Sequence, residues 1–373
     1  MVKIVNICDV CSEIFAGGDA PKGNMSETKT EEYTIPIYAN GEANEGLYGY
    51  TNKARVTKPS ITVSARGTIG YTAIRPTPFV PIVRLITLTP NPELIDIKYL
   101  YYAAQNYKFD GSGTSIPQLT VPSLKKYSFP LPAMEEQAHI VMILDNVCDL
   151  IYQKKQQLEL LDELVKSRFI DLFGTTGKQA PLTDYVWFQE GPGVRSVDFT
   201  DDGTILLTGS NINDNAISFG HKSDRHISNE LASGKYAHFM CDKDDILVVS
   251  SAIDPDKFDK KVVVVDVDNK YCLNTGIIRF KPNKQYLTLG YFREFLKTDY
   301  FKHQVSSEMR GIAQMHFGPS HLKQMSILLP DSIESQIEFE KFVQQTDKSK
   351  LAVQQSIGEL EELKKSLMQK YFG

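Results

Sequence analysis

The sequence has few of the features that mark a secreted or membrane-bound protein. No stretch approaches the roughly 20 uninterrupted apolar residues that a membrane helix needs. The first ten residues lack a basic segment followed by an apolar run, which is the pattern of a signal peptide. We therefore expect a cytoplasmic protein that has no membrane partner.

Cysteine is scarce, with 5 residues in a chain of 373. An odd number without a signal peptide does not make a disulfide framework. Cys8 and Cys11 form a C-x-x-C pair, but Cys241 and Cys272 lie about 30 residues apart and cannot supply the second close pair of a zinc site. We interpret Cys8 and Cys11 as packing residues and expect neither a metal nor another cofactor.

Motifs for catalysis are also missing. There is no Walker loop, and Asn91-Pro92-Glu93-Leu94 lacks the second proline and the aromatic residue of a methyltransferase motif that receives a flipped base. Asp256 and Asp259 are too close in sequence for a metal-dependent nuclease, whose carboxylates should sit on neighbouring strands. We interpret five of the seven histidines as surface or groove residues: His221, His226, His303, His316 and His321. The sequence therefore predicts a protein that is not an enzyme.

The net charge of −5 is unevenly distributed. Residues 1–132 carry 13 basic and 11 acidic side chains, and residues 175–330 carry 18 and 19. Residues 133–174 carry 4 and 8, and residues 331–373 carry 6 and 8. Because the two longer segments are almost neutral, each can still present a local basic surface.

An internal repeat organises the chain. Phe129-Pro130-Leu131-Pro132 followed by Glu135-Glu136-Gln137 matches Ile327-Leu328-Leu329-Pro330 followed by Glu334-Ser335-Gln336, at an offset of 198 or 199. Ile116-Pro117-Gln118-Leu119 matches Ile312-Ala313-Gln314-Met315, and both copies end alike, with Leu172-Phe173-Gly174 and Tyr371-Phe372-Gly373. Such order is typical of a duplicated structural unit.

The globular parts of the repeat match more weakly. Residues 34–40 correspond to residues 205–211, and residues 61–64 correspond to residues 246–250; all four segments are rich in apolar or β-branched residues and predict short strands. Residues 99–105 and 291–298 predict one short helix in each copy. The two copies are thus expected to share a fold and to differ at the surface.

Each copy ends in a pattern typical of a long helix. Residues 134–172 contain no glycine or proline, and apolar residues recur every seven positions, which predicts a coiled-coil seam. The second tail has a similar stripe, interrupted by Lys350, Gly358 and Lys364. A helix of 40 residues would be about 60 Å long. The predicted pairing residues are Leu144, Ile151, Leu158, Leu161, Val165, Leu172, Val353, Ile357, Leu360 and Leu367.

We predict an α+β chain with four segments. Globular domains at residues 1–132 and 175–330 are each followed by a spacer helix, at residues 133–174 and 331–373. A long helix with one apolar face needs a partner, so the two helices are expected to pair as an antiparallel coiled coil. The alternative is that each helix packs only on its own domain.

These motifs resemble those of one known family. The order Gly-Thr-x-x-x-Gln-Leu, Leu-Lys, Leu-Pro-x-x-Glu-Glu-Gln and a long helix, from Gly113 through Leu172, resembles the specificity subunit of type I restriction-modification systems. Residues 63–70, 35–40 and 191–195 resemble elements of that family's target recognition domains. The resemblance implies two target recognition domains that each read one half of a bipartite sequence in double-stranded DNA. It also implies assembly with two methyltransferase subunits and with a motor-nuclease subunit, which supply the chemistry.

The second copy departs from this pattern. Ser250-Ser251-Ala252-Ile253-Asp254 stands where the first copy has Ser64-Ala65-Arg66-Gly67-Thr68, so the counterpart of Arg66 is open. Ile333-Glu334-Ser335-Gln336 is a weaker version of the first motif. The residue-level comparison is therefore less direct for the second copy.

Basic side chains flanked by smaller polar ones are the expected DNA-binding residues, because cations contact phosphates while donors and acceptors read base edges. In the first copy they are Lys53, Arg55, Lys58, Ser64, Arg66, Thr68, Arg75 and Gln118. In the second copy they are Arg195, Asn211, Lys222, Arg225, Lys260, Lys261, Arg310, Gln314 and His316. The competing hypothesis is a coiled-coil scaffold or interaction protein that binds no nucleic acid.

Overall fold

The computed structural model describes residues 3–76, 78–107, 118–174, 178–220, 222–251, 254–307 and 317–373. Its contacts divide the chain into two compact units. Unit 1 contains Met1–Gln156 and Val353–Gly373, and unit 2 contains Gln157–Ala352. The boundaries of the sequence repeat at residues 132, 174 and 330 stay a prediction.

Unit 1 is built on an antiparallel sheet with the order β2-β8-β5-β6. A second sheet has the order β4-β3-β7, in which β3 and β7 are parallel, and β1 pairs with β9. The strands are β1 (Lys3–Asn6), β2 (Cys11–Ala16), β3 (Ile35–Tyr38), β4 (Leu47–Thr51), β5 (Ser60–Val63), β6 (Thr72–Arg75), β7 (Val80–Pro81), β8 (Ile86–Pro90) and β9 (Ser128–Leu131). The helices are η1 (Ile7–Asp9), η2 (Ala43–Gly46), α1 (Ile97–Asn106) and α2 (Val121–Leu124).

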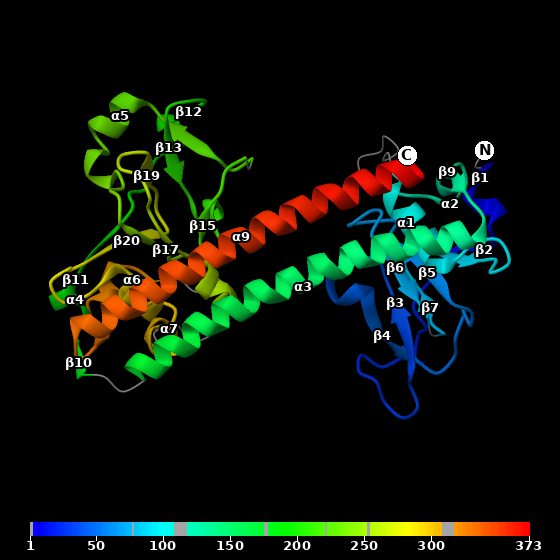
Figure 1. The fold of residues 1–373 in the computed structure, drawn as a ribbon, viewed down its shortest axis with the longest axis horizontal. Helices are drawn as coiled ribbons and strands as arrows, with labels where there is room; N and C mark the ends of the chain where they lie inside the picture. The colour runs from blue at the N-terminus through cyan, green and yellow to red at the C-terminus, as the bar shows by residue number, and fades with distance from the viewer. Residues whose placement is uncertain are drawn as a thin grey trace. The chain divides into compact units, whose positions relative to one another are not determined.

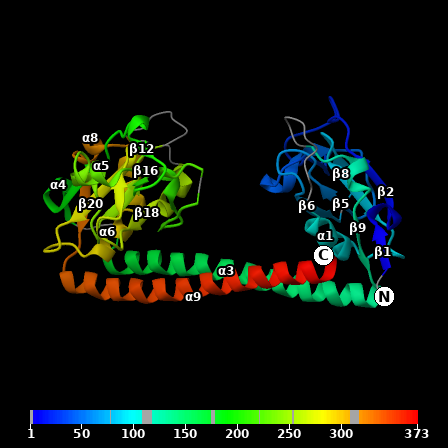
Figure 2. The same ribbon diagram turned by 90° about the horizontal axis from the view of Figure 1, so that it is seen from above.

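Helix α1 holds the core of unit 1 together. It begins at Asp96, whose side chain accepts hydrogen bonds from the backbone amides of Lys98 and Tyr99. Helix α1 packs on β5 and β6 (Figure 1; Figure 2). The ring of Tyr99 in the same helix contacts the ring of Phe372. The central strand β5 is buried along its whole length, as expected for a short β-branched strand covered on both faces.

Unit 2 repeats this plan. Its antiparallel sheet has the order β11-β20-β17-β18, a second sheet has the order β12-β16-β13-β19, and β10 pairs with β21. The strands are β10 (Lys178–Pro181), β11 (Val186–Glu190), β12 (Phe199–Thr200), β13 (Thr204–Leu207), β14 (Ile212–Asn213), β15 (Ala216–Ile217), β16 (Arg225–Ile227), β17 (Ile246–Val249), β18 (Val262–Val264), β19 (Tyr271–Leu273), β20 (Ile277–Pro282) and β21 (Ser326–Leu329). The helices are α4 (Leu182–Tyr185), η3 (Ser196–Asp198), η4 (Gly209–Asn211), α5 (Asn229–Ser233), η5 (Ala237–Phe239), η6 (Pro255–Lys260), α6 (Leu289–Phe295), α7 (Asp299–Ser307) and α8 (Pro319–Leu322).

The glutamine of the repeated motif does the same work in both units. The Gln137 side chain accepts a hydrogen bond from the amide of Asp96, and its amide nitrogen donates to the carbonyls of Leu94 and Pro132. Gln336 accepts from the amide of Thr288 and donates to the carbonyls of Tyr286 and Ser332. Each glutamine therefore ties the start of a long helix to the loop before α1 or α6. This explains why the motif recurs at the same place in both copies.

The long helices are α3 (Met134–Phe173) and α9 (Ile333–Phe372), each of 40 residues. Within unit 2, Asp162 pairs with Lys350 at 2.5 Å, and Arg168, further along α3, pairs with Glu338, further back along α9. The two helices therefore run antiparallel and in contact. Lys350, which interrupts the apolar stripe, is accounted for by this ion pair. The predicted α+β class and the contact between the long helices are confirmed.

All ten predicted pairing residues are at least half-buried. Leu144, Ile151, Val165, Val353 and Ile357 are buried. The remaining five are half-buried: Leu158, Leu161, Leu172, Leu360 and Leu367.

Within the described ranges, no helix has both the length and the apolar character needed to span a membrane.

The end of each long helix closes a unit with an aromatic ring. Phe372 of α9 lies 4.9 Å from Tyr99, measured between ring centroids in unit 1. Phe173 of α3 lies 4.8 Å from Tyr291 in unit 2. The hydroxyls of these tyrosines donate to the carbonyls of Pro130 and Leu328. Each unit thus contains the beginning of one long helix and the end of the other.

Candidate nucleic-acid interface

The segment after β5 in unit 1 forms a tight loop that exposes Arg66 and Thr68. The amide of Ser64 donates to the carbonyl of Tyr71, and the amide of Gly70 donates back to the carbonyl of Ser64. Gly67 has φ 69° and Gly70 has φ 89°, a conformation that glycine adopts without steric cost. The loop therefore has a defined backbone that holds the side chains of Arg66 and Thr68 at the surface.

Arg66 meets a second arginine and Gln118 at this surface. The Gln118 side-chain oxygen accepts from Nη2 of Arg66 at 3.0 Å and from Nη1 of Arg84 at 3.4 Å. The structure thus brings together two of the sequence candidates, Arg66 and Gln118. Arg84 was missed by the sequence analysis, because a single arginine between apolar residues carries no pattern.

The other exposed cations of the first copy are Lys53, Arg55 and Lys58. Arg55 lies 3.5 Å from Glu13 and stacks over the ring of Phe15 at 4.7 Å. An exposed ion pair of this kind contributes little to stability, so Arg55 can exchange its partner for a phosphate at small cost.

Arg75 and Ser64 serve the interior of unit 1 instead. Arg75 is 3% exposed and donates to Thr62 and to two oxygens of Glu45. Its guanidinium stacks on the ring of Tyr38 at 3.7 Å. Ser64 is buried and accepts from the amide of Gly41. Both side chains are therefore part of the interior of unit 1.

In unit 2, four of the candidate cations are exposed: Arg195, Lys222, Arg225 and Lys260. Arg225 donates to the carbonyls of Lys222 and Asp224, which places two positive side chains on one short turn. Lys260 lies 3.4 Å from Asp214. Arg310, Gln314 and His316 lie outside the described residues.

In unit 2, Asn211 is buried and Lys261 is half-buried. The buried Asn211 side chain accepts from Thr208 and donates to Ser218 and Asp224. Lys261 donates to the carbonyl of Ile212 and to the side chain of Asn213, and its burial lowers its pKa. Both side chains stabilise the turn around η4.

The backbone gives a different alignment of the two loops from the one that the sequence suggested. The amide of Leu119 donates to the carbonyl of Ala65, and the amide of Phe317 donates to the carbonyl of Ser250. Phe317, not Met315, is therefore the counterpart of Leu119. Ser250 is the counterpart of Ala65, so Ser251 stands in the position of Arg66.

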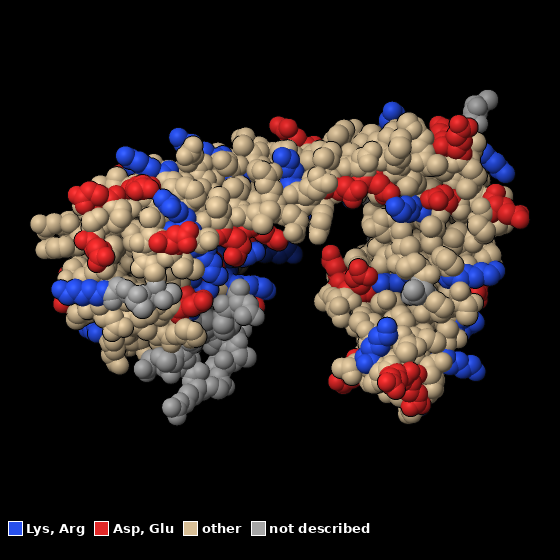
Figure 3. Space-filling model, turned by 60° about the horizontal axis from the view of Figure 1, so that its bottom comes forward, with Lys and Arg blue, Asp and Glu red and all other residues tan. Residues whose placement is uncertain are grey.

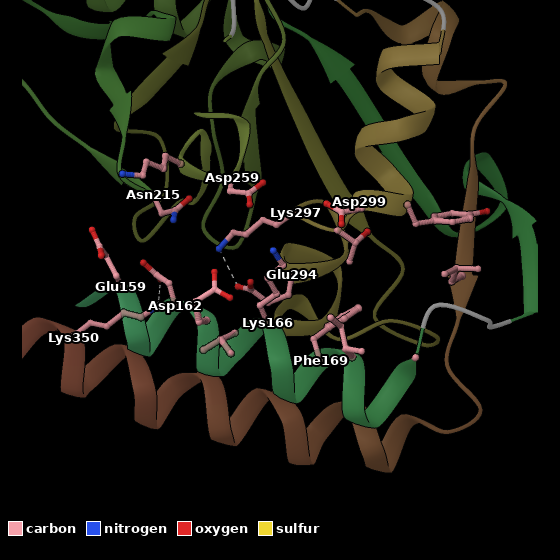
Figure 4. Close-up of a pocket in the computed structure, with 18 residues that line it drawn as sticks. Glu159, Asp162, Lys166, Phe169, Asn215, Asp259, Glu294, Lys297, Asp299 and Lys350 are labelled. Atoms are coloured by element: carbon pink, nitrogen blue, oxygen red, sulfur yellow. Dashed lines mark hydrogen bonds and ion pairs between the residues drawn. The ribbon is translucent and has the colours of Figure 1, made fainter. Parts of the chain in front are cut away.

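Unit 2 also contains a cavity of about 520 Å³ beside α3 (Figure 4). Two ion pairs join charged side chains that line it, Lys297 with Glu294 and Lys350 with Asp162. Burial alone would raise the pKa of Glu294, but the charges of Lys297 and Arg293 outweigh it and lower the pKa. Asp259, which also lines the cavity, pairs with Lys302. In the described part of the chain, no group of three or more His, Cys, Asp or Glu side chains is arranged to hold a metal ion.

The charge distribution gives no single basic face on the side of the units that Figure 3 shows. Basic and acidic side chains are interspersed there on each unit. The chemistry of the surface therefore depends on local clusters such as the pair Arg66 and Arg84.

Cys8 and Cys11 are free thiols, and burial, together with the neighbouring Cys8, raises the pKa of Cys11 to about 12.

Comparison with known proteins agrees with this architecture. A family model described as "Type I restriction modification DNA specificity domain" matches residues 1–160 and 182–365. The S subunit of a type I restriction-modification system from M. genitalium has a similar fold in its crystal structure, with a TM-score of 0.54 and 17% identity, and the match covers 100% of this chain and 96% of that one. A chain from a structure of the type I R-M system gives a TM-score of 0.56 at 15% identity, covering 99% and 97%.

Sequence relatives agree over shorter stretches. A Mycoplasma pneumoniae protein named as a type I specificity subunit, S.MpnORF89P, is 36% identical over 143 residues, which are 38% of this chain and 42% of that protein. The type I restriction enzyme MjaIX specificity subunit of Methanocaldococcus jannaschii is 32% identical over 168 residues, which are 42% and 38% of the two chains. The match spans about two fifths of the length of these relatives.

The duplicated α+β unit with paired long helices is thus the fold of a type I S subunit. Since the family model matches most of the chain, the protein belongs to the type I restriction-modification DNA specificity family.

Proposed function

We propose that this chain is the non-catalytic, cytoplasmic subunit that gives a type I restriction-modification complex its DNA sequence specificity. Each unit reads one half of a bipartite target in double-stranded DNA. The chain directs two methyltransferase subunits, and a motor-nuclease subunit, to that target. The observation that carries the proposal is the duplication of one fold, with a loop cluster in unit 1 that offers arginine donors for a nucleic acid.

The differences between the two copies support a target with unlike halves. Unit 1 presents Arg66 where unit 2 has Ser251, and the exposed cations of the second copy lie on other turns, at Arg195, Lys222 and Arg225. Base edges in the major groove are distinguished by the donors and acceptors that face them. Two units with different donors are therefore expected to select different sequences.

Binding selection tests the proposal directly. The full chain, assembled with its methyltransferase partner, is incubated with a random DNA library, and the bound fraction is sequenced. We expect two short conserved half-sites separated by an unread gap of several base pairs. One continuous site would contradict the two-reader proposal, and no enrichment at all would favour a coiled-coil scaffold that binds no nucleic acid.

The spacer helices provide a second test. Removing one heptad from each of α3 and α9 shortens both helices by about 10 Å, which corresponds to about three base pairs of duplex. We expect a shorter gap with both half-site sequences unchanged. Altered half-sites with an unchanged gap would refute the idea that the helices set the spacing.

A further inference from the structure

Two positive side chains converge on one neutral atom at the surface of unit 1. Arg66 and Arg84 both donate to the side-chain oxygen of Gln118, although the three residues come from separate segments of the chain. Both arginines are exposed, and neither forms an ion pair with a carboxylate among the described residues. These two guanidinium groups lie close together without a carboxylate beside them. Their hydrogen bonds become stronger when a ligand with strong acceptors replaces the amide oxygen of Gln118.

The backbone beneath these side chains is fixed by Asn40. Its side-chain oxygen accepts from the amide of Ala65 at 2.7 Å, and its side-chain nitrogen donates to the carbonyl of Val83 at 2.6 Å. Ala65 precedes Arg66 and Val83 precedes Arg84, so one asparagine joins the two arginine loops. The amide of Leu119 donates to the carbonyl of Ala65 and brings Gln118 to the same place.

Arg84 occupies a backbone conformation that L-residues rarely adopt. Val83 has φ 51° and Arg84 has φ 62°, while most residues with positive φ in proteins are glycine, asparagine or aspartate. The amide of Gly17 donates to the carbonyl of Leu85, and in unit 2 the amide of Gly191 donates to the carbonyl of Ile277. Leu85 and Ile277 are therefore equivalent, and the residue before Ile277, Gly276 with φ 78°, is the counterpart of Arg84. Unit 2 thus meets the same backbone requirement with the residue that suits it. An arginine in this place points to a use for its side chain.

The comparison of the units also separates two kinds of DNA contact. Phosphates have the same chemistry in every sequence, so a contact to phosphate serves both copies of a duplicated reader equally well. Unit 2 has Ser251 in place of Arg66 and Gly276 in place of Arg84, and a Cβ on Gly276 would lie 3.0 Å from Cβ of Ser251. The two positions are therefore neighbours in both units, but only unit 1 makes them cationic. Donors that differ between the copies suit base edges, which differ between half-sites.

We propose that Arg66 and Arg84 read a guanine in the half-site bound by unit 1, with Asn40 as the residue that positions them. Guanine offers O6 and N7 in the major groove, and O6 is a carbonyl oxygen like the Gln118 atom that both arginines now contact. On binding, guanine O6 takes the place of the Gln118 oxygen. This inference rests on the proposed function and adds the base and the residues that recognise it.

The test uses binding selection with the full chain in complex with its methyltransferase partner. Arg84→Gly removes the donors and gives unit 1 the residue that unit 2 has at this turn, so the fold is preserved. Preference for guanine at one position of one half-site should fall roughly ten- to a hundred-fold, with the other half-site unchanged. Arg66→Ser should relax the same position or the adjacent one. Asn40→Ala should relax it too, which a merely structural role would not do at a single base pair.

Two matched controls separate the causes. Val83→Gly relieves the neighbouring strained residue of the same turn without removing a donor, and Lys126→Ala removes an exposed positive charge from another part of unit 1. Both should keep the wild-type selection.

The outcomes are distinct. A uniform loss of affinity for all sequences with Arg84→Gly, and a salt dependence whose slope falls by about 1, would mean a phosphate contact and would overturn the guanine proposal. Unchanged selection by Arg84→Gly would overturn it as well. Failure of the wild-type complex to select any bipartite DNA would instead refute the proposed function on which the inference rests.

Discussion

Replacing Gln137 by leucine should destabilise unit 1 far more than the small change in side-chain volume suggests. The side chain is 1% exposed and makes three hydrogen bonds, to the amide of Asp96 and the carbonyls of Leu94 and Pro132. Leucine fills similar space but satisfies none of these backbone groups. At about 1 kcal/mol for each hydrogen bond, the free energy of unfolding should fall by about 3 kcal/mol. For a body of this size that corresponds to a drop of about 6 to 12 °C in melting temperature.

The measurement combines calorimetry with amide hydrogen exchange. In Gln137→Leu, the backbone amide of Asp96 should lose its protection from exchange. Glu136→Ala, an exposed substitution in the same turn, should leave the free energy of unfolding within about 0.5 kcal/mol of the parent value. Gln336→Leu should produce the same pattern in unit 2 at the amide of Thr288. A stability change under 1 kcal/mol with unchanged protection of Asp96 would refute the view that this glutamine holds the helix to the domain.

Three further predictions concern stability and reactivity. Phe372→Ala, at a side chain 4% exposed against Tyr99, should cost about 3 to 5 kcal/mol in urea unfolding monitored by exchange in α1, and an unaffected α1 would argue against it. Because folding lowers the pKa of Glu294, its carboxylate stabilises the fold fully above the ordinary pKa of 4.5, and this stabilisation is lost as the pH falls through the lowered pKa. Glu294→Gln should lower the free energy of unfolding by about 3 kcal/mol at pH 7 and flatten the acid side of the curve of stability against pH. Equal curves for the two proteins would contradict this. Burial raises the pKa of Cys11 to about 12, so its alkylation at pH 8 should be at least tenfold slower in the folded protein than in urea, and equal rates measured by mass spectrometry would show that the thiol is not shielded.

The long helices could be predicted closely from the sequence. The expected helix over residues 134–172 is observed as Met134–Phe173, because an uninterrupted seven-residue pattern without glycine or proline has few alternatives. The strand expected at residues 61–64 is observed as β5 (Ser60–Val63), and the helix expected at residues 99–105 as α1 (Ile97–Asn106). Local patterns of this length determine the elements but not their neighbours.

The candidate site was harder to predict, because charge in a sequence does not reveal burial. Arg75 and Lys261 were expected at the surface, yet Arg75 fills the space beside Tyr38 and Lys261 caps a turn with its ammonium group. Arg84 was not among the candidates, because its position beside Gln118 depends on a positive φ and on contacts with distant segments. Tertiary hydrogen bonds also corrected the alignment of the second copy, which short matching motifs had shifted by two residues at Met315.

The exchange of helix ends has a consequence for how such a chain can be divided. Tyr99 is covered by a residue of the second repeat, and Tyr291 by a residue of the first. A fragment that stops after Gly174 would keep Phe173 but lose Phe372, so the ring of Tyr99 would be exposed to solvent. Two identical fragments could each cover the Tyr99 of the other with Phe173. A single fragment would instead expose an apolar surface and become more sensitive to proteolysis.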